Sequence, residues 1–246
     1  MRIERDRFLV FGHRGCPLTN PENTLPSFAE CIRKGIPGAE LDVHLTKDGK
    51  LVVAHDFTLE RTSFSQTVIE ETDFLALEKE NVGAYLGKKE RIPLLEEVLE
   101  LGKGKLYFDI ELKANALTDH GLEKLVWETI QKQQMAASVL VSSFNPLSLR
   151  RFNKISRGAV DSGVIYSNGK DIPRIIRGGR CRHIAKATYL KPDWRETKQA
   201  KDWPVIPWAV DKEEDIRAML ELHVSGIISN NPCTVLEVLG KERRPY

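Results

Sequence analysis

The sequence predicts an α/β protein whose eight parallel strands close into a (β/α)8 or TIM barrel. Short runs rich in apolar and β-branched residues alternate with segments of helical periodicity along the 246-residue chain. Each strand–helix pair occupies about 30 residues, the size of one βα unit, and eight such pairs can be counted. The rival fold, an open doubly wound sheet, ordinarily carries a glycine-rich dinucleotide turn or a P-loop, and neither pattern occurs here.

Each predicted strand is an apolar run that ends in polar or turn-forming residues. The first, FLVFG, stops at a His-Arg-Gly turn, and the second, GAELDVHL, is followed by the shorter run LVVA. Later runs such as KLYFDIE, SVLVSS and DSGVIY follow at one per repeat. The predicted strands lie at roughly 8–12, 38–45 with 51–54, 105–111, 138–143, 161–166, 183–190, 204–209 and 225–229.

The predicted helices begin with local signals. Thr24 can cap a helix that has Pro26 in its first turn. Asn145 stands before Pro146 in the same way, and Asp211 precedes a pair of glutamates. Apolar side chains then recur at i, i+3 and i+4, which is typical of helices packed on a sheet. The predicted helices lie at roughly 24–35, 93–101, 119–134, 146–156, 171–178, 196–202, 212–223 and 232–239.

The chain is expected to fold as one domain over residues 1–246, because a barrel of this kind accommodates the whole length. The connection from about 57 to 92 is long for a βα unit. We expect it to form a small cap, inserted after the second strand region and lying over the mouth of the barrel.

Composition excludes several classes of protein. The 37 basic and 35 acidic side chains leave a net charge of +2, so no strong field draws the chain to nucleic acid or to an anionic membrane. No apolar stretch approaches the roughly 20 residues that cross a bilayer, and the amino terminus lacks a signal-peptide h-region. We therefore expect a cytoplasmic protein without stable membrane insertion. Its four cysteines form no C-x-x-C pair and are expected to be free thiols, while the oligomeric state stays open.

The residues that carry chemistry stand where predicted strands end. In a barrel the carboxyl ends of all strands meet at one face, so side chains on those ends converge. The period of two along a strand also puts Glu40 on the same side as Asp42. The convergent set consists of His13, Arg14, Glu40, Asp42, His55, Glu111 and Lys113.

Three carboxylates at one concave mouth would repel one another unless a cation or protons compensate them. Oxygen-only ligation by Glu40, Asp42 and Glu111 favours a hard divalent ion, Mg²⁺ or Ca²⁺, over zinc. It also leaves coordination positions for water or a phosphate oxygen. In the alternative interpretation, one or more of these acids only pairs with Arg14 or Lys113.

The basic residues of this set suit phosphoester chemistry. Arg14 is expected to hold a non-bridging phosphate oxygen by charge-assisted hydrogen bonds, with Lys113 as a second positive group. His13 and His55 are the natural general acid and base, because imidazole titrates near neutrality. The substrate expected from these groups is a small-molecule phosphodiester.

Other polar residues have less specific predictions. Glu22 and Asn23 are expected to cap the first helix or to orient the site through hydrogen bonds, with direct metal contact disfavoured for Glu22. His44 is left unassigned. A histidine beside apolar residues is more often a core or surface group, and this is the interpretation of His120, His183 and His223.

The ordered set of motifs resembles the glycerophosphodiester phosphodiesterase family over nearly the whole chain. The resemblance rests on His13-Arg14-Gly15, Pro21-Glu22-Asn23-Thr24, Glu40-x-Asp42-Val43, His55-Asp56 with Thr58-Leu59-x-Arg61-Thr62, Ile92-Pro93-x-Leu95-x-Glu97-Val98-Leu99, Ile110-Glu111-Leu112-Lys113, Ser142-Ser143-Phe144 and Trp208-Ala209-Val210.

This resemblance implies the barrel, a divalent cation held by the three acids, and the two histidines as the acid/base pair. It further implies hydrolysis of glycerophosphodiesters to sn-glycerol 3-phosphate and an alcohol. Arg14 and Lys113 match phosphate-binding positions. Trp208 matches an aromatic residue at the mouth that packs against the glycerol moiety, with core packing as an equal alternative.

Two segments depart from the family pattern. The usual glycine-bearing segment after Thr62 is replaced by Ser-Phe-Ser-Gln, so the pocket for the alcohol is expected to differ. The usual Thr-Asp-x-Pro appears as Ser229-Asn230-Asn231-Pro232, which replaces a carboxylate by an amide. Two other functions stay open: a lysophospholipase D-like enzyme with an apolar ramp, for which Phe57, Phe64 and Phe74 are candidates, and a silent barrel that only binds phosphodiesters.

Overall fold

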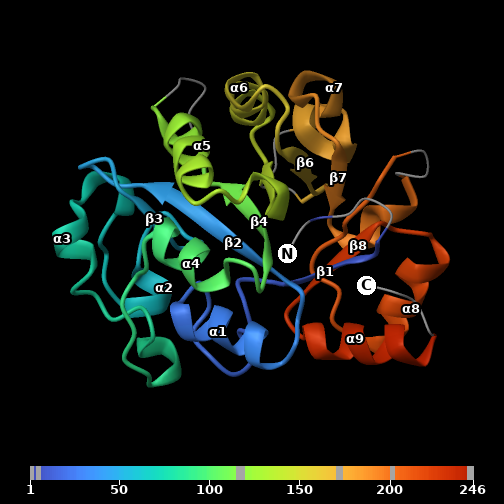
Figure 1. Ribbon diagram of the computed structural model, residues 1–246, viewed down its shortest axis with the longest axis horizontal. Coiled ribbons are helices and arrows are strands. Elements are labelled where there is room, and N and C mark those ends of the chain that lie inside the picture. The colour runs from blue at the N-terminus through green and yellow to red at the C-terminus, as the bar shows by residue number, and fades with distance from the viewer. Residues whose placement is uncertain (1–2, 4–6, 115–119, 170–173, 200–202, 243–246) are drawn as a thin grey trace.

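The strands lie at the centre of the molecule and the helices surround them (Figure 1). The computed structural model describes residues 3, 7–114, 120–169, 174–199 and 203–242. The strands are β1 (Leu9–Gly12), β2 (Gly38–Leu45), β3 (Leu51–Val53), β4 (Tyr107–Leu112), β5 (Val139–Ser143), β6 (Asp161–Tyr166), β7 (Tyr189–Pro192) and β8 (Gly226–Ser229). The helices are α1 (Leu25–Arg33), α2 (Glu60–Ser63), α3 (Phe74–Leu77), α4 (Leu95–Gly102), α5 (Leu122–Lys132), α6 (Pro146–Ser156), α7 (Arg182–Ala185), α8 (Glu213–Glu221) and α9 (Pro232–Lys241).

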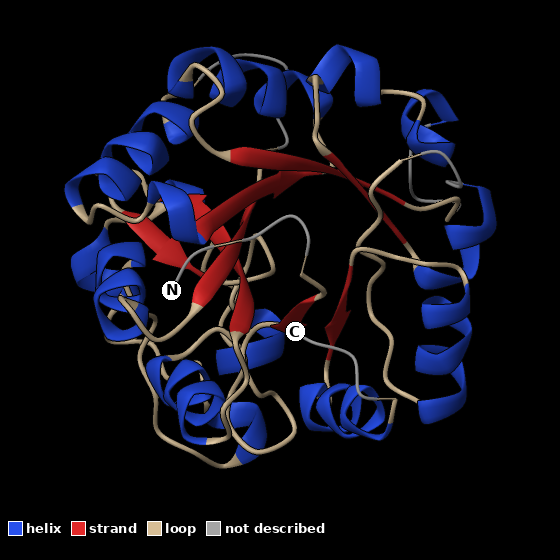
Figure 2. Ribbon diagram, turned by 45° about the vertical axis from the view of Figure 1, so that its right-hand side comes forward, coloured by secondary structure: helices blue, strands red, loops and turns tan. Residues whose placement is uncertain are grey.

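The strands follow one another in the order β7-β6-β5-β4-β2-β1-β8, and each pairs parallel with its neighbours. Strand β3 is an antiparallel hairpin partner of β2 outside this order. Figure 2 shows the strands curled around a common axis, with the helices forming the outer layer. Apolar side chains on the outer strand face and the inner helix faces form the main core, and the helical periodicity in the sequence reflects this packing.

Residues 205–210 close the sheet between β7 and β8. A parallel bridge joins Leu190 of β7 to Val205. On the other side the Ile228 N–H of β8 donates to the Pro207 carbonyl at 3.0 Å. The segment therefore takes the place of the eighth parallel strand, and the predicted (β/α)8 barrel is confirmed.

Several predicted elements in the second half of the chain are wrong in detail. The strand predicted at 183–190 begins only at Tyr189, because the preceding residues form α7. A short apolar run does not distinguish a strand from a buried helical turn. The strand predicted at 204–209 is held by isolated bridges instead of a continuous ladder. The helices predicted at 171–178 and 196–202 are 3₁₀ turns over Arg174–Gly179 and Trp194–Gln199, while residues 171–173 and 200–202 lie outside the described residues.

The predicted helix starts have different outcomes. The Asn145 side chain caps α6, accepting from the Leu147 and Ser148 N–H groups at 3.0 and 3.3 Å. Thr24 stands at the N-cap position of α1, but its hydroxyl donates to the Pro21 carbonyl. Asp211 does not cap α8, which starts at Glu213 with Lys212 at the N-cap position.

Side chains fill the barrel interior in layers, as is typical of this fold. The lowest layer is apolar and includes Phe11 and Tyr107, whose rings meet edge-to-face at 5.0 Å. Above it Lys191 forms an ion pair with Asp109 and donates to the Ser142 hydroxyl at 2.7 Å. All three polar side chains are buried, so this ion pair forms a charged floor beneath the mouth.

Replacing Lys191 by methionine is expected to lower the free energy of unfolding by about 3–5 kcal/mol, because the Asp109 charge would stay buried without its cation. Denaturant unfolding of both proteins measures the difference. The matched control is Arg217→Met, which removes a cation from exposed pairs with Glu213 and Glu242 and is expected to change stability far less. Equal losses in the two variants would contradict the prediction.

The segment 57–92 contains α2, α3 and the 3₁₀ turns Ile69–Glu71 and Ala84–Leu86. It has a small apolar core of its own, built on β3. Its Lys88 ammonium donates to the Thr19 carbonyl at 2.5 Å, so the segment lies against the loop that follows β1. Its role as a cap over the mouth and the single-domain organisation stay predictions. The buried members of its core are Val52, Leu59, Ile69, Leu77, Val82 and Ile92.

Two further expectations concern the whole chain. Among the described residues, no helix combines the length and the apolar character that a bilayer span requires. The four cysteines are free, as expected. Cys16 and Cys31 nevertheless meet in the core, with their Sγ atoms 3.2 Å apart.

Candidate active site

The loop after β1 turns sharply and carries His13 and Arg14. The φ angles of Arg14 and Gly15 are positive, at 56° and 90°. A Cβ on Gly12 would lie 2.2 Å from the Gly15 carbonyl oxygen, so only glycine fits this position. The turn directs the backbone N–H of Arg14 to Glu40, whose Oε2 accepts at 3.0 Å. The local backbone therefore ties the first strand end to the second.

The fold brings three acidic side chains together at the mouth. Glu40, Asp42 and Glu111 each offer one carboxylate oxygen, and these oxygens lie within 4.8 Å of one another. All three residues are buried. The register of the sheet explains the cluster, because Asp42 on β2 is the direct partner of Glu111 on β4.

Basic groups compensate this acidic cluster only in part. The Lys113 ammonium lies 2.9 Å from Asp42 Oδ1 and 2.7 Å from Glu111 Oε1, and these carboxylates raise its pKa against the effect of burial. Burial also opposes the lowered pKa of Asp42, but Lys113 and other nearby positive charge outweigh it. Glu40 behaves differently, since burial and the other two carboxylates raise its pKa well above the usual value.

The donor set fits a hard divalent cation. Mg²⁺ and Ca²⁺ bind carboxylate oxygens at about 2.0–2.6 Å. Three oxygens within 4.8 Å of one another can therefore share one ion. The raised pKa of Glu40 indicates negative charge that Lys113 and Arg14 leave uncompensated, and a dication would relieve it. The pairings with Arg14 and Lys113 that the sequence left as an alternative are present as well.

The two predicted histidines each have one ring nitrogen anchored by a side chain. His13 Nδ1 lies 2.7 Å from Asn230 Oδ1, and its Nε2 lies 4.0 Å from Glu40 Oε2. His55 Nδ1 lies 2.7 Å from Asp56 Oδ1. Burial lowers the pKa of both rings, that of His13 to about 4. Both imidazoles are therefore held in fixed orientations with a second nitrogen left for chemistry.

Glu22 links the first loop to α2. Its Oε1 accepts from Arg14 Nη1 at 2.9 Å and from Arg61 Nη2 at 2.6 Å. Arg61 Nε also donates to Asp56 Oδ2 at 2.7 Å. The sequence offered capping or orientation for Glu22, and the structure shows orientation. The sequence did not indicate that Arg61 bridges this loop and Asp56, the partner of His55.

Asn23 and Trp208 also have defined places. The Asn23 amide donates to Asp42 Oδ2 at 2.8 Å, so it orients that carboxylate and does not cap α1. Trp208 Nε1 donates to the Lys191 carbonyl at 2.9 Å, and its ring meets Phe144 edge-to-face at 5.7 Å. The indole is thus anchored, only partly exposed and packed against the apolar interior cluster, while its contact with the glycerol moiety stays a prediction.

His44, left unassigned from the sequence, is a buried packing residue. Its ring meets Phe57 edge-to-face at 4.7 Å, and its Nε2 lies 3.4 Å from the His55 carbonyl oxygen. Its Nδ1 lies 3.7 Å from Glu70 Oε1. It supports the turn that carries His55.

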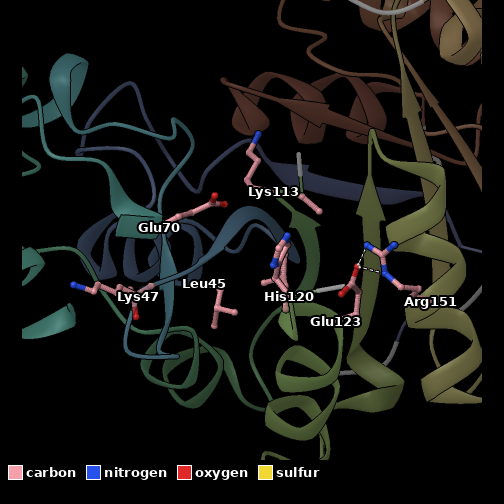
Figure 3. A pocket seen from close by; sticks show the side chains of 10 residues that line it. Leu45, Lys47, Glu70, Lys113, His120, Glu123 and Arg151 are labelled. Atoms are coloured by element: carbon pink, nitrogen blue, oxygen red, sulfur yellow. Dashed lines mark hydrogen bonds and ion pairs between the residues drawn. The ribbon is translucent and has the colours of Figure 1, made fainter. Parts of the chain in front are cut away.

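A cavity of about 500 Å³ opens beside the acidic cluster. Figure 3 shows Glu70 and Lys47 on one side of it, Glu123 and Arg151 on the other, and Lys113 and His120 between them. Glu123 accepts from Arg151 Nη2 at 2.7 Å, so the two opposite charges on that side of the cavity neutralise each other. Because Lys113 also contacts the acidic cluster, the cavity adjoins the predicted reaction site. Its apolar lining comes from Leu45, Ala114 and Leu122.

The position where the sequence departs from the family pattern contacts a catalytic candidate. The Asn230 Oδ1 atom lies 2.7 Å from His13 Nδ1, and the Asn230 amide nitrogen donates to Asp211 Oδ2 at 2.9 Å. The Asp211 Oδ1 atom accepts from the Asn230 N–H at 2.7 Å. The sequence assigned Asp211 to a helix start, and only the fold shows that it supports the loop after β8.

Comparison with known proteins assigns the chain to a family. The model of the glycerophosphoryl diester phosphodiesterase family matches residues 13–234. The chain belongs to this family. It is 33% identical over 239 residues to a glycerophosphodiester phosphodiesterase from Caldanaerobacter subterraneus subsp. tengcongensis, covering 95% of this chain and 98% of that protein. The resemblance and the class of enzyme expected from the sequence are therefore both confirmed.

Solved structures agree with the fold. A glycerophosphoryl diester phosphodiesterase from Silicibacter pomeroyi superposes with a TM-score of 0.84 at 21% identity, covering 99% of this chain and 97% of the other. A phosphodiesterase from Oleispira antarctica, solved with the product sn-glycerol-3-phosphate, gives a TM-score of 0.78 at 24% identity, with 94% and 96% covered. At these identities the likeness supports the barrel fold.

Proposed function

We propose that this member of the family hydrolyses glycerophosphodiesters to sn-glycerol 3-phosphate and an alcohol, and that a divalent cation and two histidines carry the reaction. The observation that carries the proposal is the cluster of Glu40, Asp42 and Glu111, whose oxygens lie within 4.8 Å beside two oriented imidazoles. The product named for the Oleispira antarctica relative supports the same cleavage.

The cation-binding residues are Glu40, Asp42 and Glu111, and the ion is Mg²⁺ or Ca²⁺. When bound, the ion supplies Lewis acidity to a phosphate oxygen. Arg14 binds a non-bridging phosphate oxygen, and Glu22 holds its guanidinium in place at 2.9 Å. Lys113 adds positive charge beside the same oxygens, and Trp208 packs against the glycerol moiety.

The two histidines exchange the protons of the reaction. One imidazole accepts a proton from the attacking oxygen as a new P–O bond forms. The other donates a proton to the alcohol oxygen as the bond between that oxygen and phosphorus breaks. The anchored Nδ1 atoms of His13 and His55 keep the opposite nitrogens turned to the reacting atoms.

A second candidate is turnover of lysophospholipids, which keep one acyl chain. One observation favours it: Phe64 is 71% exposed and follows α2, which lies against the turn carrying the 44% exposed Leu86. The other two aromatic residues of the predicted ramp support it less, because Phe57 packs on His44 and Phe74 packs on the core of the segment 57–92.

The test compares glycerophosphocholine with lysophosphatidylcholine at a fixed concentration of Mg²⁺ or Ca²⁺. We expect the higher kcat/KM for the deacylated ester, because five of the ten described residues that line the cavity beside Lys113 have acidic or basic side chains. Release of choline, the product that both esters give, is measured by a coupled assay, with EDTA as the metal-free control. Preference for the acylated ester would favour the lysophospholipase function, and inactivity on several diesters with metal supplied would favour a binding protein.

A further inference from the structure

A chain of hydrogen bonds that the proposed reaction does not use ends on His13. It runs from Asp211 through the side-chain amide of Asn230 to His13 Nδ1, with distances of 2.9 and 2.7 Å. Asp211 precedes α8 and lies beyond the first contacts of the imidazole. It can therefore act on the ring only through Asn230.

Asp211 has a fixed orientation. The backbone N–H of Asn230 donates to its Oδ1 at 2.7 Å. The Ser229 hydroxyl lies 3.0 Å from the same oxygen, and because that hydroxyl accepts from the Asn231 N–H at 3.0 Å, its own proton is free to go to Asp211. Two donors thus hold Oδ1, and Oδ2 is left to face the Asn230 side chain.

The orientation of Asn230 follows from the chemistry of a carboxylate. An ionised carboxylate only accepts hydrogen bonds, so the amide must turn its NH₂ group to Asp211 and its oxygen to His13. An amide oxygen likewise only accepts, so the proton of a neutral His13 ring must be on Nδ1. The lone pair is then on Nε2, the nitrogen that lies 4.0 Å from Glu40.

We propose that Asp211 is a positioning residue which, through Asn230, fixes the tautomer of His13 so that the unprotonated Nε2 faces the reacting atoms. The catalytic part of this inference rests on the proposed function. The family pattern places a carboxylate at position 230. Here the carboxylate belongs to Asp211, and the side-chain amide of Asn230 stands between it and His13. His55 needs no such intermediate, because Asp56 contacts its Nδ1 directly at 2.7 Å.

The structure suggests a substitution that reverses this chain of hydrogen bonds. In Asp211→Asn the two donors at Oδ1 retain the carbonyl oxygen there, so the new NH₂ group faces Asn230. Asn230 must then present its oxygen to residue 211 and its NH₂ to His13. The His13 proton moves to Nε2, which is the wrong tautomer for a base at that nitrogen.

The double variant Asp211→Asn/Asn230→Asp restores the original polarity. The amide at position 211 donates to the new carboxylate at position 230, whose second oxygen accepts from His13 Nδ1–H. We expect Asp211→Asn to lower kcat about 10- to 100-fold with KM changed less than about twofold. The double variant is expected to recover kcat to within about fivefold of the parent.

The tautomer itself is measured by two-bond proton–nitrogen correlation NMR of the His13 ring at about pH 8, where a neutral imidazole is expected. We expect Nδ1–H in the parent and the double variant, and Nε2–H in Asp211→Asn. The matched control, Asp215→Asn on α8, removes one carboxylate from a neighbouring position without contact to Asn230 and is expected to change neither readout.

An Nε2–H ring in the parent, or an unchanged tautomer in Asp211→Asn, would overturn the inference even if that variant lost activity. The NMR measurements of the His13 tautomer need no substrate. An enzyme that is inactive on every diester would thus count against the proposed function, while the tautomer of His13 in the three proteins would still decide whether Asp211 positions that ring.

Discussion

Replacing His13 or His55 by alanine is expected to lower kcat about 10²- to 10⁴-fold, the usual contribution of one general acid or base. Each ring has its Nδ1 anchored, so each change removes a positioned proton carrier and little of the surrounding structure. KM is expected to change much less, because the proposed phosphate-binding groups, Arg14, Lys113 and the cation at the acidic cluster, stay in place. Steady-state release of glycerol 3-phosphate from glycerophosphocholine measures both constants.

The matched control for this prediction is His183→Ala. His183 lies exposed on α7 against Trp203, away from the acidic cluster. It is expected to leave kcat unchanged. The assignment of roles would fail if His13→Ala and His55→Ala both kept more than about a tenth of the parent kcat.

Loss of the divalent cation is expected to have an equally large effect. EDTA should reduce activity to background, and Mg²⁺ or Ca²⁺ in excess should restore it, because the proposed reaction needs a cation at Glu40, Asp42 and Glu111. Asp42→Asn and Glu40→Gln are expected to abolish this recovery. Activity titrated against free metal concentration measures the effect.

Glu40→Gln allows a sharper test, because it should remove activity without lowering the stability of the metal-free protein. The raised pKa of Glu40 means that its charge destabilises the metal-free fold. This penalty is absent while Glu40 is protonated in both states, and it grows as the pH rises from about 4.5 through the raised pKa. In EDTA at neutral pH, Glu40→Gln should therefore unfold at a temperature no lower than the parent.

Added metal should then stabilise the parent more than Glu40→Gln, since the cation binds the folded state through the acidic cluster. Thermal unfolding with and without metal measures both shifts. Glu96→Gln is the control, because Glu96 is a surface residue that pairs with Lys132 at 3.0 Å. A metal-independent unfolding temperature for the parent would contradict binding at this cluster.

Position along the strands was enough to predict most of the candidate site. Glu40 and Asp42 are two residues apart on a strand, so they must point to the same side. His13 follows β1, whose carboxyl end meets those of the other parallel strands at one face of the barrel. His55 reaches the same face differently, because β3 runs antiparallel to β2 and returns the chain to Asp42, whose carbonyl accepts from the Ala54 N–H at 3.1 Å. The same logic could have identified Asp109, which has the strand parity of Glu111 and pairs with Lys191 beneath the mouth.

Other features could not be predicted because no local pattern encodes them. Glu22 and Arg61 meet across 39 positions of sequence, through a contact between the first loop and α2. Asp211 has the sequence signature of a helix start, yet its carboxylate accepts a hydrogen bond from the loop after β8. A short-range signal reports only what a side chain can do, and it does not report which distant partner lies within reach.

The sequence by itself determined the barrel, the family and the residues that gather at its mouth, because strand period and strand order fix direction and proximity. Only the tertiary structure decided which of those residues are neighbours in detail. The pairing of β2 with β4 sets Asp42 beside Glu111, and the loop after β8 sets Asn230 between Asp211 and His13. Hydrogen-bond partners depend on distances of a few tenths of an ångström, which packing of the whole chain establishes and sequence spacing does not.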